Sequence, residues 1–525
     1  MHALAALGLT ASGLELLLGS TAQPVEAQMA EARNLVLIVL DAFRPDYMQL
    51  APMPNLDRLV RTGTTYDRAW VGQLESETPV GYATLSTGSV PNRDGVIGFE
   101  WRDPKTGREV LDGWPPGVLA GDLDRDMRAS GAGSIPGAMK AANPAAKVIA
   151  LSSEKVYAAD AMGAARADYV LYHQRVGSNP LVLVPRGVPG HVPPLDFFDH
   201  RYLREEFPLK RFTDWDWLST MLALSAIESF HPEVLMVNMP GADVFGHPYG
   251  GSATPTVMSE VVAGLDRNIG RILDAYRQAG IYNQTLFVVA ADHGMVPNNR
   301  TVAGSTTKAA VQQAGGQYLF HTGGTAADIY LHNSWHARAV SQEMFRVSGV
   351  EAAYYRIQPH GKPEYLLAPG LAIDPALDAA CQYLLSTFVG PTSPDVVASY
   401  RENTIGEAYT TAHGDHGGLN WGAQHVPLIF SGPGVLSGFI SHFPARLMDV
   451  APTALRLLGV PIPAMDGIVL ADALTLPLSA DVAAQVPLAR PLTARQDALI
   501  AQSAENLAED QRLGISPPPS ATPSP

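Results

Sequence analysis

The chain has 525 residues, of which 46% are hydrophobic and 17% are charged, a composition typical of a globular protein with one large domain or several smaller ones. The formal net charge of −15 argues against stable binding to nucleic acid or to an anionic membrane surface, because both would require a basic protein surface. The single cysteine, Cys381, excludes an intrachain disulfide and a thiolate metal cluster, so any metal ion would need histidine and carboxylate ligands.

Residues 1–27 form a signal-like segment. An apolar run is followed by small residues and ends at Val25-Glu26-Ala27, which is similar to a secretory cleavage site. No lysine or arginine precedes the run and Glu15 interrupts it, so we expect the true start of the protein to lie upstream. The segment predicts a periplasmic or secreted protein, with a cytoplasmic one as the alternative. No other stretch has the length and apolarity of a transmembrane anchor.

Five short apolar runs alternate with helical patterns, of which the clearest covers 255–280. Such alternation predicts an α/β fold with a central, mostly parallel sheet sandwiched by helices, here over residues 33–485. Ligand groups in such sheets collect at the carboxyl ends of the strands. Asp41 and Asp292 each end an apolar run, and Asp243 follows another closely. The runs predicted to be strands are 34–41, 147–151, 233–239, 285–292 and 426–432.

Thr78 and Pro79 open a helical pattern in the stretch ESETPVGYATLSTG, residues 75–88. Threonine suits the N-cap of a helix and proline suits its first position, so the pattern predicts Thr78 as the N-cap. The same end of a helix holds anions such as phosphate through its backbone N–H groups. Ordinary capping and hydroxyl chemistry on a phosphate group therefore both remain open from this stretch alone.

The later part of the chain is less regular. Residues 300–420 are rich in Gly, Tyr and Pro with weak periodicity, which indicates a smaller inserted cap region. Residues 447–463 are typical of a helix and turn that close the core. From 486 onward we expect one more helix and then a Pro- and Ser-rich tail, up to residue 525, that is unable to form a packed core.

Three aspartates and three histidines lie near predicted strand ends. Each of them alone could be a helix cap or a packed histidine. Together they make a ligand set that suits Zn²⁺, Mn²⁺ and related ions, and six ligands divide into two sites of three, each with a position left open for substrate. These residues are Asp41, Asp243, His247, Asp292, His293 and His425.

The motifs ADVFGH, DHGM and HVPLIFSGPG, found in this order after Thr78, resemble those of the alkaline phosphatase superfamily, in its type I phosphodiesterase/nucleotide pyrophosphatase and bacterial phosphatase branch. The resemblance covers residues 33–300 and 405–470. It implies two divalent metal ions, zinc first with manganese or iron as alternatives, and Thr78 as a metal-bound nucleophile that forms a phosphothreonine. The implied ligands are Asp243, His247 and His425 for one ion, and Asp41, Asp292 and His293 for the other.

The residues expected to contact the phosphate depart from the pattern of threonine-dependent monoesterases, which carry an asparagine about 21 residues after the nucleophile and a Lys-x-Arg pair. Phe99 stands at the asparagine position, and Lys155 is followed by Tyr157 in place of arginine. Each missing charge-assisted contact would cost a monoester dianion roughly 1.5–3 kcal/mol. Phe99 and Tyr157 would instead offer apolar surface to the second substituent of a diester, and His416 is a further candidate for orienting substrate. The sequence therefore predicts a phosphodiesterase that acts on a small phosphate ester.

Other functions remain open. They are an alkaline phosphatase-type phosphomonoesterase, a phosphonoacetate hydrolase-like enzyme, and a non-catalytic family member that keeps its metal ions for structure. A formylglycine sulfatase would need cysteine or serine in a C/S-x-P-x-R run, which 78–82 does not supply. No pattern indicates the oligomeric state.

Overall fold

The computed structural model describes residues 31–111, 122–163, 166–175, 181–183, 193–203, 213–249, 257–406 and 413–515. The signal-like segment and the Pro- and Ser-rich end of the tail lie outside the described residues, so export stays a prediction. In the part of the chain that is described, no helix combines the length and the apolar character needed to cross a membrane.

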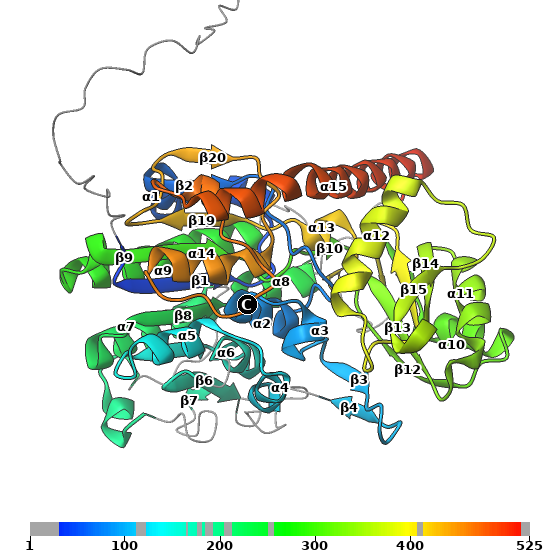
Figure 1. Cartoon of the computed structure of the whole chain (residues 1–525), viewed down its shortest axis with the longest axis horizontal. Coiled ribbons are helices and arrows are strands. Elements are labelled where there is room, and N and C mark those ends of the chain that lie inside the picture. Colours follow the sequence, from blue (N-terminus) through cyan, green and yellow to red (C-terminus); the bar gives the residue numbers. More distant parts are fainter. Residues whose placement is uncertain are drawn as a thin grey trace, which may run out of the picture.

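A nine-stranded mixed sheet forms the centre of the larger part of the molecule (Figure 1). The strand order is β20-β2-β19-β9-β1-β8-β5-β6-β7, and the pairs from β9 through β6 are all parallel. All five predicted strands are present in it. The bounds are β1 Asn34–Leu40, β2 Gly63–Tyr66, β5 Val148–Ser152, β6 Tyr169–Arg175, β7 Leu181–Leu183, β8 Val234–Met239, β9 Thr285–Ala290, β19 Leu428–Ser431 and β20 Phe439–Ser441.

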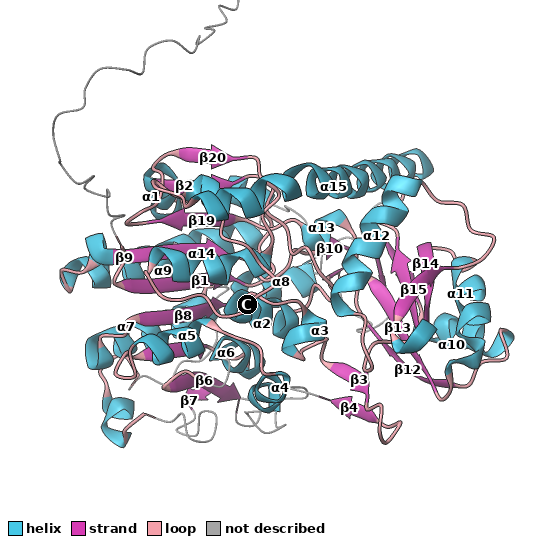
Figure 2. Cartoon of the chain, in the orientation of Figure 1, coloured by secondary structure: helices cyan, strands magenta, loops and turns pink. Residues whose placement is uncertain are grey.

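The middle strands β1, β8 and β9 are buried along almost their whole length, because helices flank the sheet. This explains their continuous apolar sequences, which differ from the alternation of a strand with one wet face. The helices around the sheet (Figure 2) form two sets, each packed together. One set is α1 Pro54–Thr62, α7 Asp214–Phe230, α8 Gly241–Tyr249 and α9 Val257–Gln278; the other is α2 Thr78–Thr87, α5 Ile135–Ala142, α6 Val156–Gly163 and α14 Val450–Leu457. Further helices in the described portion of this part are α3 Pro91–Asp94, α4 Asp122–Ser130 and α13 Trp421–Gln424.

A second sheet occupies the region that the sequence marks as an insertion, and it lies beside the main sheet (Figure 1). It is antiparallel throughout, with the order β12-β13-β16-β14-β15 and its own apolar cluster. Its strands are β12 Tyr318–Thr322, β13 Ala326–Leu331, β14 Val350–Ile357, β15 Glu364–Leu367 and β16 Val396–Tyr400, with helices α10 Gly304–Gln313, α11 Ala337–Phe345 and α12 Pro375–Phe388. Short two-stranded pairs connect this region to the rest: β3 Glu100–Arg102 with β4 Glu109–Leu111, β10 Val296–Pro297 with β18 Gly414–Asp415, and β11 Arg300–Val302 with β17 Thr404–Gly406.

The last helix, α15 Ser479–Leu513, reaches from the main sheet to the second sheet (Figure 1). It begins earlier than residue 486, where the sequence analysis places the helix, because Asp481 accepts the backbone N–H of Leu478 and also pairs with Arg456. Further along the helix, Asp497 pairs with Arg68 and Asp510 with Arg300. The helix is thus tied to both parts of the chain.

Candidate active site

Parallel strands bring the three predicted aspartates to one edge of the main sheet. Asp41 follows β1 directly, and Asp292 lies two residues beyond the end of β9. Asp243 lies in the first turn of α8, which follows β8. Since β8, β1 and β9 are neighbours and parallel, their carboxyl ends meet at the same place.

Thr78 faces this edge from the start of α2. The helix begins at Thr78 itself and Glu77 takes the cap position, so Thr78 is the first helical residue and not the predicted N-cap. Its Oγ1 lies 3.2 Å from Nε2 of His293, in a buried environment. Gly81 allows this approach, because a Cβ there would lie 2.5 Å from the carbonyl oxygen of Asp292.

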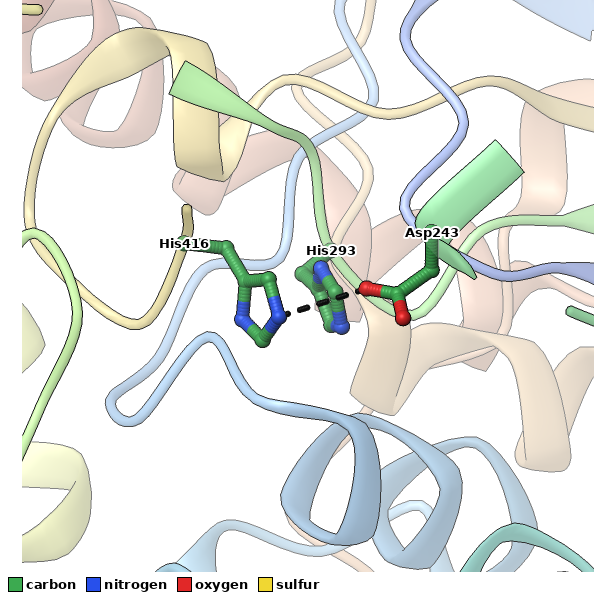
Figure 3. Close-up of side chains that lie close together, drawn as sticks. All are labelled: Asp243, His293 and His416. Atoms are coloured by element: carbon green, nitrogen blue, oxygen red, sulfur yellow. Dashed lines mark ion pairs between the residues drawn. The ribbon is translucent and has the colours of Figure 1, made fainter. Parts of the chain in front are cut away.

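The structure does not bring His425 to the cluster. The ring of His425 stacks on Trp421, and its Nε2 contacts the backbone oxygen of Asp67 at 3.3 Å. His416 lies at the cluster instead, with Nε2 3.3 Å from Oδ1 of Asp243 and its ring stacked on that of His293 (Figure 3). The short strand β18 places His416 there, whereas His425 precedes β19 on the far side of α13.

Asp41 and Asp292 are the two carboxylates beside Thr78. In each of them, hydrogen bonds from backbone or neutral side-chain groups hold one of the two oxygens. Oδ2 of Asp41 accepts hydrogen bonds from the amide of Asn238, at 2.7 Å, and from the hydroxyl of Tyr82, at 3.3 Å. Oδ1 of Asp292 accepts the backbone N–H of Ala42 at 3.1 Å. Oδ2 of Asp292 is buried and accepts no hydrogen bond from any described residue. Each carboxylate therefore keeps one oxygen for the cluster.

The histidines show the same arrangement. Each ring donates a hydrogen bond through Nδ1 to a backbone carbonyl, which leaves Nε2 directed at the aspartates. This fixes both the tautomer and the orientation of each ring, as is usual for histidines that bind metals. The pairs are His247 with Gly414, His293 with Gly294, and His416 with Ser76.

Lys155 lies at the centre of the cluster. Its Nζ is 2.8 Å from Oδ1 of Asp41, 2.6 Å from Oδ2 of Asp243 and 3.4 Å from Oγ1 of Thr78. It is the only lysine or arginine that pairs with either aspartate among the described residues. The loop between β5 and α6 presents it, since the backbone N–H of Lys155 is held by the hydroxyl of Ser152 at 3.0 Å.

The cluster carries an excess of buried negative charge. Burial and the neighbouring Asp292 raise the pKa of Asp41 to about 7, against the opposing effect of Lys155. Burial acts in the same direction on Asp243, but Lys155 and His247 outweigh it and lower its pKa well below the usual range. Burial lowers the pKa of His293, and Asp292 more than offsets this, raising it to about 9. Such a site favours the binding of cations.

The potential metal ligands form three overlapping groups, and within each group the ligand atoms lie within 4.8 Å of one another. Figure 3 shows the group of Asp243, His293 and His416. Buried Oδ1 of Asp243 and Oδ2 of Asp292 accept no hydrogen bond from the described residues, so each has the free lone pairs that a metal ion would take. The donors are imidazole nitrogens and carboxylate oxygens, which fit zinc, manganese or iron. The groups are Asp41, Asp292 and His293; Asp243, His293 and His416; and His247, Asp415 and His416.

Tyr157 lies near Lys155, and Phe99 packs against Tyr157. Their rings form an edge-to-face pair with centroids 4.9 Å apart. The backbone N–H of Phe99 donates to the carboxylate of Glu77, next to Thr78. Tyr157 lies in the first turn of α6 and is electrostatically coupled to Lys155, Asp243 and Asp41. The structure therefore places this aromatic pair near the cluster, and its contact with substrate stays a prediction.

Three functional candidates are absent from the sequence analysis: Asn238, Tyr82 and Asp415. Tyr82 lies one helical turn after Thr78, and that spacing could have indicated that both face the same edge. The Asp-His-Gly triplet at 292–294 occurs a second time at 415–417, a repeat that favours His416 over His425. Asn238 follows only the buried pattern of β8, which carries no signal of its role.

The chain and its fold have parallels among known proteins. A family model described as "Type I phosphodiesterase / nucleotide pyrophosphatase" matches residues 35–418. Alkaline phosphatase PhoK of Sphingomonas sp is 24% identical, over 82% of this chain and 89% of PhoK. Alkaline phosphatase PhoD of Zymomonas mobilis is 23% identical, over 82% of this chain and 86% of PhoD.

Two solved structures show the same fold. Wild-type alkaline phosphatase PafA superposes with a TM-score of 0.64 at 16% identity, over 85% of this chain and 99% of PafA. Murine ectonucleotide pyrophosphatase/phosphodiesterase 5 in complex with AMP superposes with a TM-score of 0.56 at 14% identity, over 83% of this chain and 97% of that protein.

Proposed function

Since this chain belongs to the type I phosphodiesterase/nucleotide pyrophosphatase family and is a hydrolase of phosphoric esters, we propose that it cleaves phosphodiesters with Thr78 as nucleophile beside two divalent metal ions. The observation that supports this is the common orientation of the cluster. Six side chains each turn one ligand atom inward, and hydrogen bonds hold the outer atom of five of them. Such pre-organisation suits metal binding and is costly to maintain without a function.

The cluster divides into two candidate metal sites. Metal ions there would supply positive charge that favours the alkoxide form of Thr78 and stabilises the leaving oxygen. Zinc is our first choice, because these nitrogen and oxygen donors match its preferences. The residues proposed to hold one ion are Asp41, Asp292, His293 and Thr78, and those for the other are Asp243, His247 and His416.

In the proposed reaction, Oγ1 of Thr78 attacks phosphorus and forms an O–P bond while the bond to the leaving alcohol breaks. The hydroxyl proton of Thr78 leaves with the alcohol. Water then attacks phosphorus and breaks the O–P bond to Thr78; one proton of the water restores the hydroxyl, and the phosphate monoester leaves with the remaining OH group. Lys155 would bind a non-bridging oxygen, because its Nζ lies between Thr78 and both aspartates. The hydrogen bonds that hold Asp41 and His293 fix their distance to Thr78, which lowers the reorganisation needed during attack.

The residues around Lys155 support the proposed preference for diesters. Among the described residues, the site offers one ammonium group and an aromatic pair, Phe99 and Tyr157. A diester has a single negative charge and an additional organic substituent, which match one cation and apolar surface. A monoester dianion would need more charged donors.

A phosphomonoesterase is the second candidate. The curated relatives PhoK and PhoD are named alkaline phosphatases, and each matches 82% of this chain. The same Thr78 and metal ligands would serve that reaction, so the two candidates differ only in substrate.

The test is a comparison of kcat/KM for bis-p-nitrophenyl phosphate and p-nitrophenyl phosphate. We expect the diester to be favoured, and a strong monoester preference would instead support the second candidate. Thr78→Ala should lose at least about 1,000-fold in kcat with both substrates, while Thr78→Ser should keep measurable turnover. A chelator should abolish turnover and added Zn²⁺ should restore it. Turnover that survives both Thr78→Ala and metal removal would exclude the proposed mechanism.

A further inference from the structure

Asp415, in the short strand β18, is a fourth buried carboxylate at the cluster. Its Oδ1 accepts the backbone N–H of His416 at 2.9 Å and lies 3.9 Å from Nδ1 of His247. Its Oδ2 is buried and accepts no hydrogen bond from the described residues. The residue is 5% exposed, so its charge is poorly screened by water.

The backbone holds Asp415 in this place from two sides. β18 pairs with β10, which puts Asp415 opposite Val296, shortly after the Asp292-His293 pair. The loop at Gly324 presses against it, since a Cβ on Gly324 would lie 2.6 Å from Oδ1 of Asp415. The carboxylate is therefore fixed by the fold and buried by contact with the second sheet.

Asp415 and Gly414 face the outer edge of the same imidazole. Nδ1 of His247 donates to the carbonyl of Gly414 at 2.9 Å, and Asp415 lies beside this bond. Nε2 on the opposite edge of the ring is 3.4 Å from Oδ1 of Asp243. A negative charge behind a donating Nδ1–H strengthens that hydrogen bond and makes Nε2 a better electron donor.

The charges of the two candidate metal sites also differ. Asp41 and Asp292 supply two negative charges to one site. The other site has a single carboxylate, Asp243, and two imidazoles that bring no negative charge, so a divalent cation there would leave positive charge uncompensated. Asp415 is close enough to supply the second negative charge, since one ligand atom each of Asp415, His247 and His416 lie within 4.8 Å of one another.

We propose that Asp415 is a positioning residue for the metal ion held by Asp243, His247 and His416: its charge strengthens the hydrogen bond through which Gly414 orients His247, and it provides the negative charge that this site otherwise lacks. This inference rests on the proposed function, because it requires a cation at those three residues. It assigns Asp415 to one of the two sites and not to the other.

The test measures metal binding to the full chain. Asp415→Asn removes the charge but keeps an oxygen that can accept the N–H of His416. Zn²⁺ stoichiometry and dissociation constants are measured by competition with a chromophoric chelator, and the absorption spectrum of the Co²⁺-loaded protein reports the ligand environment. We expect two Zn²⁺ per chain in the wild type. In Asp415→Asn, one site should stay unchanged and the other should weaken about 10- to 100-fold, with an altered Co²⁺ spectrum.

Asp328→Asn is the matched control, because Asp328 is also a buried carboxylate and lies in β13 of the second sheet. This variant should bind both ions as the wild type does. Asp415→Ser, also neutral, provides a second variant if Asp415→Asn does not fold. Unchanged binding in the Asp415 variants, or equal weakening of both sites, would overturn the inference while leaving the proposed function intact. A wild-type chain that binds no divalent cation would overturn the proposed function itself.

Discussion

Gly81→Ala tests whether the contact between α2 and the end of β9 positions the nucleophile. A Cβ at Gly81 would lie 2.5 Å from the carbonyl oxygen of Asp292 and 2.8 Å from its Cβ, and real contacts of this kind are essentially never under 3.0 Å. Relieving the overlap requires α2 and Asp292 to separate by about 0.5–1 Å. The atoms involved are backbone or Cβ, so no flexible side chain can absorb the change.

The shift would act directly on catalysis, because Thr78 lies one turn before Gly81 and its Oγ1 is 3.2 Å from Nε2 of His293. A misplacement of about 1 Å can cost on the order of 100-fold in rate. We expect kcat for bis-p-nitrophenyl phosphate to fall about 10- to 100-fold with a smaller change in KM, while overpacking lowers the free energy of unfolding by about 1–3 kcal/mol.

The assay is steady-state kinetics at saturating Zn²⁺ together with thermal unfolding. Gly390→Ala is a matched control, because Gly390 is buried, its φ is not positive, and an added Cβ would meet nothing closer than 3.8 Å. A Gly81→Ala enzyme with kcat within about threefold of the wild type would refute the reasoning, since a shift of about 1 Å at the nucleophile should be costly.

Three further outcomes are expected. The double variant Phe99→Asn/Tyr157→Arg should raise kcat/KM for p-nitrophenyl phosphate about 10- to 100-fold relative to the diester, because it adds charge-assisted donors; an unchanged ratio would argue against the role of the aromatic pair. Lys155→Ala should lower kcat/KM about 10- to 100-fold, and an enzyme unaffected by this change would show that Lys155 does not bind substrate. Burial raises the pKa of Asp328 to about 7, so the folded protein holds this proton more tightly than the unfolded protein. The free energy of unfolding therefore falls as the pH rises from about 4 to 7. Asp328→Asn should therefore be more stable relative to the wild type at pH 8 than at pH 5, and melting temperatures that differ equally at both pH values would contradict this.

The sheet, and the edge of it that carries the candidate site, could be predicted from the sequence because they depend on local patterns. Strands buried on both faces need continuous apolar runs, and the polar residues that end them must lie at the edge. Asp41, Asp243 and Asp292 were placed in this way, and His247 follows Asp243 by one helical turn. Their spatial meeting is a consequence of strand order, which the structure provides.

The choice between His416 and His425 depended on a long-range contact. Both histidines lie in a glycine-rich stretch, nine positions apart. The pairing of β18 with β10 decides which histidine reaches the cluster. These two strands are too short to show a recognisable hydrophobic period in the sequence. Tertiary pairing also explains Thr78: the sequence has the features of a capped helix start, but the helix begins one residue earlier because Glu77 takes the cap position and the hydroxyl turns to His293.

The long helix α15 has a mechanical consequence. Its first turn is bound to α14, beside the main sheet, through the pair of Asp481 with Arg456. Its last turns are bound to β11, next to the second sheet, through the pair of Asp510 with Arg300. The helix therefore bridges the two sheets, and they can move apart only if this helix bends or detaches. Pro487 and Pro491 lie within it, and each removes a backbone hydrogen bond at its position. Both prolines precede Asp497, which pairs with Arg68 beside β2, so they lie in the part of the helix that is bound to the main sheet. Any opening of the molecule is therefore expected to bend the helix between Asp497 and Asp510.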